Sequence, residues 1–284
     1  VASLCYGVIF KKAFSQPDVF TAFVKDILGI ELDIDHVETE KSFPSPIGSI
    51  DSRFDLFAED KAKRIIVDIQ HRRYGDHYHR FLHYHCAALL EQAVSARNYQ
   101  PALSVYTIVI LTSGDRHQRD MSQIDFDPKD RHGQGLGEIP HKILFLCPKY
   151  VNAETPEPWR EWLLAIDDSL DGQVDETHYH KACVQKILET IRQDSLTPQE
   201  RARMKDEYSE EAWLQDKLGE SLQQGLEQGL EQGLEQGLEQ GRQEEKEEVA
   251  LRLLAKGMDV VLVVEVTGLP LARVQTLLQA QRDV

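Results

Sequence analysis

The amino-acid sequence predicts an α/β fold: one mixed sheet flanked by helices, with an extended helical C-terminal tail. Three observations lead to this prediction. Segments rich in β-branched and aromatic residues recur between residues 36 and 148, a long helical pattern interrupts them, and helix-forming residues dominate from Thr197 onward. The resulting order is helix, three strands, helix and two further strands. We expect the first three strands to form a meander.

The first part of the α/β domain is expected to contain a helical region and three strands. Apolar spacing predicts helix over residues 1–30, with Pro17 near a start and Gly29 at a stop. Strands are expected at residues 36–43, 49–58 and 64–70. Residues 49–58 alternate strictly, which predicts one apolar and one polar face. The apolar face would carry Ile50, Phe54, Leu56 and Ala58, and the polar face Asp51, Arg53 and Asp55.

The rest of the domain is expected to complete the sheet and to extend its helical layer. A helix is expected at 75–98, a strand at 102–113, a polar loop at 114–140, a strand at 141–148, and helices at 157–166 and 176–193. We therefore divide the chain into an α/β domain (1–150), a helical extension of its core (151–195), a long glycine-repeat helix (196–243) and a small helical module (244–284).

Composition and charge limit the classes of function. The formal net charge is -16, and neither the α/β domain nor the tail has the basic excess of a strong non-specific nucleic-acid binder. Contact with nucleic acid would have to be local or helped by metal ions. No apolar run approaches the length of roughly 20 residues that spans a bilayer, so we expect no membrane contact. Four scattered cysteines without a metal or redox spacing indicate the reducing cytoplasm.

A four-residue repeat dominates the tail. Leucine recurs at 222, 226, 230, 234 and 238, and glycine at 225, 229, 233, 237 and 241. A four-residue period advances about 40° per repeat on an α-helix, so both rows spiral around it. Small residues permit close approach of helices, which favours self-association through residues 219–243. A spacer without a fixed partner is the alternative.

The last residues predict two short helices around the sequence VTGLP. Gly257 and Gly268 are expected to end helices, and Asp259 to cap the next one. A helix-turn-helix unit that reads DNA would use Arg273, Gln275 and Gln279. A small packing module is the interpretation we favour for residues 259–281, because the local basic charge is thin.

Two carboxylates are expected to meet on the polar face of the hairpin formed by 49–58 and 64–70. Asp55 and Asp68 are equally far from the centre of the intervening turn, so they would lie opposite each other at about 5 Å. Gln70 shares the face of Asp68 by the period of two. Two carboxylates held this close bind a proton or a cation. Oxygen ligands of this kind suit Mg²⁺, with Mn²⁺ as a second possibility.

Several motifs, taken in order, resemble a known nuclease family. The segments FKKAF, FDLFAED, RIIVDIQ, HYHRFLHYHCAALLEQ and YTIVIL look like those of the PD-(D/E)XK nuclease fold, and more narrowly of the family of recombination-promoting nucleases and transposases. The likeness covers residues 7–150, and glycine-repeat tails with a helical cap are similar too. It implies a restriction-endonuclease-like sheet, Mg²⁺-dependent DNA endonuclease activity in a bacterial cytoplasm, and DNA as the partner.

The resemblance also assigns roles to residues. Asp55 and Asp68 would be metal ligands, with the backbone carbonyl of Ile69 as a third. Gln70 stands where these nucleases usually have Lys, and would orient the attacking water without supplying charge. Arg80 and Tyr84 match an R…Y pattern that could face the scissile phosphate. The family has Asp three residues before its FK pair, where this chain has Gly7.

Further basic residues are candidate DNA contacts. Arg53 shares the polar face of Asp55. Arg72 and Arg73, with Arg80 and the surrounding histidines, form the most cationic stretch of the chain, where phosphate contact is plausible. Zinc binding by these histidines is disfavoured, because no third ligand stands at a typical spacing.

Alternatives to an active nuclease stay open. Asp55 and Asp68 could be an ordinary solvent-facing pair, and Arg80 could pair with Asp76 four residues earlier. Gly7, Gln70 and the negative net charge favour a degenerate nuclease fold that binds DNA or acts as a scaffold. The tail alone looks like helices of a flagellar export stator-binding protein, but the α/β domain argues against that function.

Overall fold

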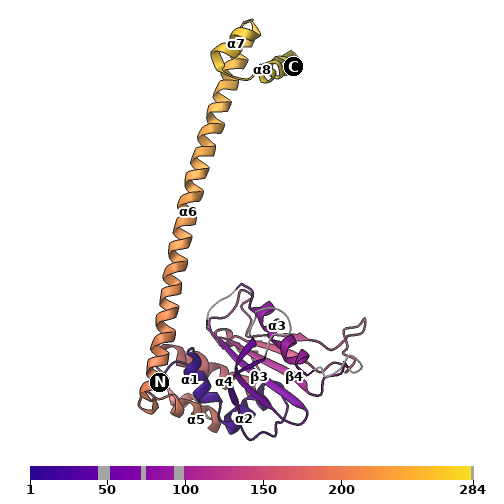
Figure 1. The fold of residues 1–284 in the computed structure, drawn as a ribbon, viewed down its shortest axis with the longest axis vertical. Helices are drawn as coiled ribbons and strands as arrows, with labels where there is room; N and C mark the ends of the chain where they lie inside the picture. The colour runs from indigo at the N-terminus through magenta and orange to yellow at the C-terminus, as the bar shows by residue number, and fades with distance from the viewer. Residues whose placement is uncertain (44–51, 72–74, 93–98, 283–284) are drawn as a thin grey trace. The chain divides into compact units, whose positions relative to one another are not determined.

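The computed structural model describes residues 1–43, 52–71, 75–92 and 99–282 (Figure 1). The chain divides into two compact units, Val1–Ser209 and Glu210–Val284. The first unit holds the sheet, and the second holds the leucine and glycine repeat.

A six-stranded mixed sheet forms the centre of the first unit. Its strands are β1 (Glu38–Phe43), β2 (Ser52–Glu59), β3 (Lys63–Gln70), β4 (Ser104–Leu111), β5 (Met121–Asp125) and β6 (Lys142–Leu146). They lie in the order β1-β2-β3-β4-β6-β5. The first three strands are antiparallel, β3, β4 and β6 run parallel, and β5 is antiparallel to β6. The predicted α/β class and the meander are confirmed.

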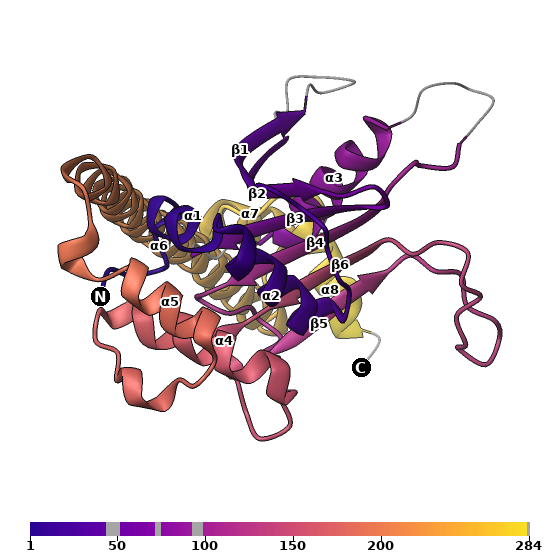
Figure 2. The same ribbon diagram turned by 90° about the horizontal axis from the view of Figure 1, so that it is seen from below.

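Helices cover both faces of this sheet (Figures 1 and 2). On one face pack α1 (Gly7–Phe14), α2 (Pro17–Leu28), α4 (Glu157–Asp168) and α5 (Ala182–Thr190). The other face carries α3 (His77–Leu90), which connects the parallel strands β3 and β4. The β3 residues Ile65, Val67 and Ile69 belong to the first core, and Ile66 belongs to the second. Strand β3 is therefore buried on both sides, as its run of aliphatic residues predicts.

Some expected elements differ from the observed ones. Strand β5 lies inside the expected loop 114–140, because pairing with β6 compensates for its weak apolar alternation. The expected helix 176–193 is broken: a short 3₁₀ turn covers Glu176–His178, and α5 starts only after Lys181, which has extended backbone angles. Helix α3 ends at Leu90, and residues 93–98 of its expected range lie outside the described residues, as do 49–51 of the second strand.

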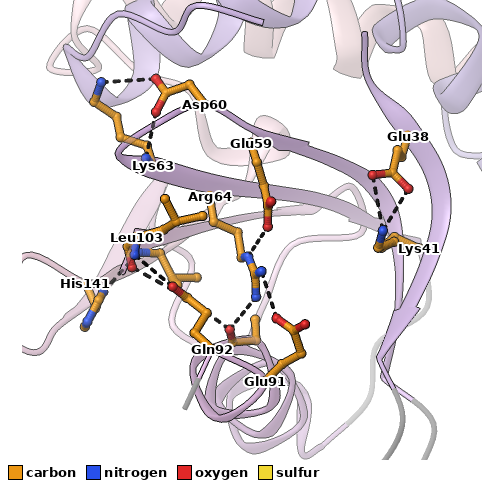
Figure 3. Close-up of polar contacts among 12 residues, drawn as sticks. Glu38, Lys41, Glu59, Asp60, Lys63, Arg64, Glu91, Gln92, Leu103 and His141 are labelled. Carbon is orange, nitrogen blue, oxygen red and sulfur yellow. Dashed lines mark hydrogen bonds and ion pairs between the residues drawn. The ribbon is translucent and has the colours of Figure 1, made fainter. Parts of the chain in front are cut away.

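The turn end of the β2–β3 hairpin is held by a buried arginine (Figure 3). Arg64 is ion-paired with Glu59 and, at 2.8 Å, with Glu91, and its side chain is only 6% exposed. It also donates to the carbonyl of Ala88 at 2.6 Å. In the turn itself, Asp60 accepts from the backbone N–H of Lys63 at 2.7 Å. Every charge here has an opposite charge or a hydrogen bond beside it.

The second unit is made of helices. Helix α6 (Pro198–Ala255) starts in the first unit, continues through the repeat and is followed by α7 (Val260–Thr267) and α8 (Leu271–Arg282). Asp259 caps α7 by accepting from Val261 N at 2.8 Å, as predicted. A small core joins the three helices and contains Ala250, Leu254, Val263, Leu269, Val274 and Leu277. No helix within the described ranges combines the length and the apolar character that a membrane crossing requires.

Candidate active site

The β-ladder is distorted at Asp55. In β1 and β2 the pairs Thr39↔Leu56 and Lys41↔Phe54 bracket Glu40 and Asp55, and Glu40 has a left-handed φ of 58°. A non-glycine residue with positive φ is uncommon in a strand. Pairing of β2 with β3 starts at Leu56↔Val67 and continues toward the turn. The register is the predicted one, so Asp55 and Asp68 come next on either side.

The distortion also corrects the predicted face of Phe54. We expected Phe54 to share a face with Leu56 and Ala58. Its ring instead packs edge-on against Phe43 and Tyr84, at centroid distances of 5.6 and 5.8 Å. Leu56 and Ala58 lie in the core on the opposite face of the sheet. The alternation shifts between Phe54 and Leu56, because the strand is irregular at Asp55.

Asp55 and Asp68 are tied to each other's strands. The Asp55 Oδ2 accepts from the N–H of Ile69 at 3.1 Å, and the Asp68 Oδ2 accepts from the N–H of Asp55 at 3.3 Å. Asp68 is 8% exposed, and Asp55 has a side-chain exposure of 22%. The structure thus brings the two carboxylates together, as predicted, and Asp68 is the more buried of the two.

Both carboxyl groups hold protons more tightly than usual. Burial, followed by the neighbouring Asp55 carboxylate, raises the pKa of Asp68 well above its ordinary value. Burial also raises the pKa of Asp55, against the effect of the Ile69 N–H and the Lys11 ammonium. The loss of hydration and the repulsion between like charges are the two physical causes. A cation placed between the two groups would relieve both.

The backbone at Ile69 faces the same place. The carbonyl of Gln70 accepts from Thr112 N at 3.1 Å, so it points to β4. Carbonyls alternate in direction along a strand. The carbonyl of Ile69 therefore faces β2, on the side where its own N–H meets Asp55. This is the side on which the predicted third ligand should lie.

Arg80 and Tyr84 connect α3 to the end of β3. Arg80 donates to the Gln70 side-chain oxygen at 3.3 Å and to the Tyr84 hydroxyl at 3.1 Å. Its guanidinium lies 5.3 Å from the centre of the Tyr84 ring, and its charge lowers the pKa of Asp68. Gln70, Arg80 and Tyr84 thus form one connected group beside the carboxylates. Arg80 therefore bonds to Gln70 and Tyr84, whereas the alternative was an ion pair with Asp76.

A lysine from α1 completes the site, and no local pattern beyond the FK pair marks it as a site residue. The Lys11 Nζ lies 2.8 Å from Glu40 Oε1 and 3.7 Å from Asp55 Oδ1. The hydrogen bond from Lys11 is the main reason why the pKa of Glu40 falls to about 2. Arg53, a predicted DNA contact, is largely exposed and ion-paired with the other oxygen of Glu40.

A further carboxylate reaches this end from the start of α6. Glu207 accepts from Gly7 N at 2.7 Å and from Val8 N at 3.2 Å, at the beginning of α1. A Cβ at Gly7 would lie 3.7 Å from Lys11 Nζ, 3.8 Å from Glu207 Oε2 and 3.9 Å from Asp55 Oδ1. The position where the resembling family carries Asp is therefore bordered by a carboxylate that comes from another helix. Glu207 lies 200 residues from Gly7 along the chain, so local sequence patterns do not predict this contact.

The other predicted contacts are reported as far as the structure describes them. Arg72 and Arg73 lie outside the described residues. In the histidine stretch, His71 contacts the Thr112 hydroxyl at 2.7 Å, and His85 is fully buried against the Thr107 hydroxyl at 2.8 Å. Within the described ranges, no three His, Cys, Asp or Glu side chains gather in a metal-binding arrangement.

The donor set nevertheless fits a hard divalent cation. Mg²⁺ binds through one or two carboxylates and keeps several waters, so it does not need three acidic side chains. Asp55, Asp68 and the Ile69 carbonyl offer only oxygen atoms, and the pKa values of both carboxyl groups are raised although Lys11 and Arg80 lie nearby. Sulfur and imidazole ligands, which would favour zinc, do not contribute to this group.

Comparison with known proteins finds no match: no family model, no curated protein and no solved structure is similar to this chain. Arguments about function therefore start from the geometry of the site.

Proposed function

We propose that the protein is a Mg²⁺-dependent DNA endonuclease that hydrolyses phosphodiester bonds, as the resemblance to recombination-promoting nucleases implies. One observation carries the proposal: Asp55 and Asp68 are held together, because each carboxylate accepts a hydrogen bond from a backbone N–H of the other's strand. Keeping a half-buried and a buried carboxylate adjacent costs stability, and a metal site explains why they are adjacent.

The chain's own groups suit this chemistry. Asp55, Asp68 and the Ile69 carbonyl would hold the metal ion, which polarises a phosphoryl oxygen and lowers the pKa of bound water. Gln70 would orient the attacking water by a hydrogen bond. Arg80, bonded to Gln70 and Tyr84, would meet the phosphate. Arg53, Arg72 and Arg73 would add contacts to the DNA backbone, which a chain of net charge -16 needs locally.

Plasmid cleavage tests the proposal. We expect the full chain to nick supercoiled plasmid DNA with Mg²⁺ or Mn²⁺, and to stop when a chelator is added. Asp55→Asn and Asp68→Asn keep an oxygen that accepts the same backbone hydrogen bonds, and each should lower the rate by about 100-fold or more. Asp35→Asn, a change at an exposed carboxylate outside the site, is the matched control. Undiminished cutting by an Asp55→Ala/Asp68→Ala protein would rule out this active site.

The second candidate function is a nuclease fold without activity that binds DNA or acts as a scaffold. Two observations favour it: Gln70 carries no charge, and Lys11 partly neutralises Asp55. Calorimetry distinguishes the two functions. DNA binding without measurable Mg²⁺ or Mn²⁺ binding selects the scaffold, whereas metal binding that Asp68→Asn abolishes selects the nuclease.

We also propose that the helix over residues 219–243 binds a second copy of the chain. Its leucines are highly exposed, from 57% at Leu238 to 77% at Leu230, and Leu214 and Leu218 extend the same four-residue row. A Cβ added at any glycine of the repeat would meet no atom within 4 Å. A leucine and the glycine three residues later lie about 60° apart around the helix, whereas the Glu and Gln between them lie about 100° and 160° from that leucine. A second copy offers the same spiral of ridges and open grooves.

Sedimentation of the full chain tests this association. We expect a dimer or higher oligomer for the native protein and a monomer for the triple variant Leu226→Gln/Leu230→Gln/Leu234→Gln. The matched control is Gln228→Ala/Gln232→Ala, which changes the polar row. A native monomer supports the spacer interpretation instead.

A further inference from the structure

We propose that Lys11 is a catalytic residue of this site and supplies the positive charge that Gln70 lacks. The inference rests on the proposed nuclease function and adds to it a residue from another element. Lys11 lies on α1, on the opposite side of the sheet from α3 and Arg80. Its ammonium group is the cation that the described structure brings against Asp55.

The position of the Lys11 ammonium is fixed by its neighbours. Glu40 Oε1 accepts one of its N–H groups at 2.8 Å, and the Lys11 side chain is only 18% exposed. Glu40 reaches it from a left-handed backbone position with a φ of 58°, the kind of strained conformation that accompanies functional sites. Asp55 Oδ1 lies on the second side of the ammonium at 3.7 Å. One of the three donors of the ammonium is thus engaged by Glu40, and the group is held at the edge of the carboxylate pair.

The other basic residues of the site are less suited to this task. Arg80 directs its guanidinium to Gln70 and Tyr84. Arg53 is 63% exposed and pairs with the oxygen of Glu40 that Lys11 does not take. Lys12, the next residue, turns to Ser195 O at 2.7 Å and Glu200 at 2.9 Å, away from the pair. Among these residues Lys11 combines a short distance to Asp55 with limited exposure.

The charge acts on the phosphate during hydrolysis. The water oxygen forms a bond to phosphorus, and the bond from phosphorus to the leaving oxygen breaks with its electron pair staying on that oxygen. The attacking water releases a proton to solvent, and the leaving oxygen takes one up. Negative charge grows on the phosphate oxygens, and the Lys11 ammonium donates a hydrogen bond to one of them. Preorganised donors of this kind contribute more to the transition state than to the ground state.

Two measurements on the full chain test the role of Lys11. The first is Mn²⁺ affinity by calorimetry without DNA, and the second is the plasmid cleavage rate at saturating Mn²⁺. Lys11→Met should bind Mn²⁺ at least as tightly as the native protein, because a competing cation is gone, yet cleave about 100-fold more slowly. Lys11→Met/Gln70→Lys places an ammonium on β3 instead of α1. It should cleave at least about tenfold faster than Lys11→Met. Lys12→Met, a change at a lysine of similar exposure, should leave both measurements unchanged.

The outcomes separate the inference from the proposed function. If Lys11→Met cleaves as fast as the native protein, or if its double variant is no faster than Lys11→Met itself, Lys11 is not the catalytic cation. Loss of Mn²⁺ binding together with cleavage in Lys11→Met shows a structural role and also overturns the inference. A native protein that neither binds Mn²⁺ nor cleaves DNA overturns the proposed function, and the role of Lys11 with it.

Discussion

The two ends of the β2–β3 hairpin differ in how their buried charges are paired. At the turn end, which we call the closed end, Arg64 is surrounded by Glu59, Glu91 and the carbonyl of Ala88 (Figure 3). At the other end, the open end, Asp55 and Asp68 stand side by side with like charge. The same two strands therefore carry one end built for stability and one whose arrangement costs stability.

The contrast marks the open end as the candidate functional end. A buried ion that is fully paired needs no further explanation, because its partners compensate for lost hydration. A buried pair of like charges does need one, and strongly shifted pKa values mark functional sites more often than chance. The difference predicts that substitutions at the two ends change the free energy of unfolding with opposite sign.

The largest expected effect is at the closed end. Arg64→Ala removes the shared partner of two carboxylates, and we expect the free energy of unfolding to fall by about 3–5 kcal/mol. Urea denaturation followed by circular dichroism measures it. Arg192→Ala is the control, because Arg192 and Glu176 form a pair with side chains 47% and 43% exposed, and an exposed pair contributes little to stability. Equal losses for both variants would remove the distinction we draw for the closed end.

An intermediate effect comes from a buried base on α3 between the two ends. Burial, with a contribution from His141, lowers the pKa of His85 to about 3. The folded protein therefore favours the neutral ring, whereas the unfolded chain takes up a proton below about pH 6.5. Stability should fall with pH in this window, and this one residue should cost about 2–3 kcal/mol between pH 7 and 4.5.

Comparison with His85→Gln isolates that contribution. Glutamine can keep a hydrogen bond to the Thr107 hydroxyl but does not titrate in this range. Denaturation at pH 7, 6, 5 and 4.5 should show a shallower decline for the variant. Parallel pH profiles would contradict the depressed pKa. Subtracting the contribution of His85 matters for the hairpin, because acid should change the stability contributed by the open end in the opposite direction.

The smallest effect is expected at the open end, and it has the opposite sign to that at Arg64. Asp68→Asn keeps an acceptor for the Asp55 N–H and removes one of two like charges. We expect the free energy of unfolding at pH 7 to rise by about 0.5–2 kcal/mol, as is common when a functional site is neutralised. Metal-free protein must be used for the urea denaturation. The matched change at the closed end is Asp60→Asn, which should lower stability because Asp60 holds the turn and pairs with Lys63. A destabilised Asp68→Asn protein would show that the pair stabilises the fold.

Local patterns were sufficient to predict most of the sheet and the meeting of the two carboxylates. The aliphatic run Ile65–Val67 and the equal distances of Asp55 and Asp68 from the turn depend only on neighbours in sequence, and the observed register agrees with them. The stops at Gly29, Gly257 and Gly268 were predicted for the same reason, and all three adopt positive φ. Strand β5 was missed because its pairing partner, β6, decides its conformation.

The rest of the site depends on contacts between distant segments. Nothing near Glu40 predicts its left-handed φ, which accompanies the irregularity of β2 at Asp55. Helix α2 and strand β1 separate Lys11 from Asp55 along the chain, and only the folded chain shows that their charges meet. The shift in phase at Phe54 likewise follows from tertiary packing against Tyr84. Period-two reasoning assumes a regular strand, and a strand that builds a site is often irregular.

The bond between Glu207 and the start of α1 bears on how the protein can be shortened. Repeat and charge patterns suggest cutting the chain near residue 195, because composition alone marks the tail as a separable appendage. Such a cut would leave the N–H groups of Gly7 and Val8 without their carboxylate acceptor, one helical turn from Lys11. The first compact unit runs to Ser209. The smallest self-sufficient fragment of the α/β domain therefore has to keep the opening turns of the tail helix, because cutting earlier removes the carboxylate at the start of α1.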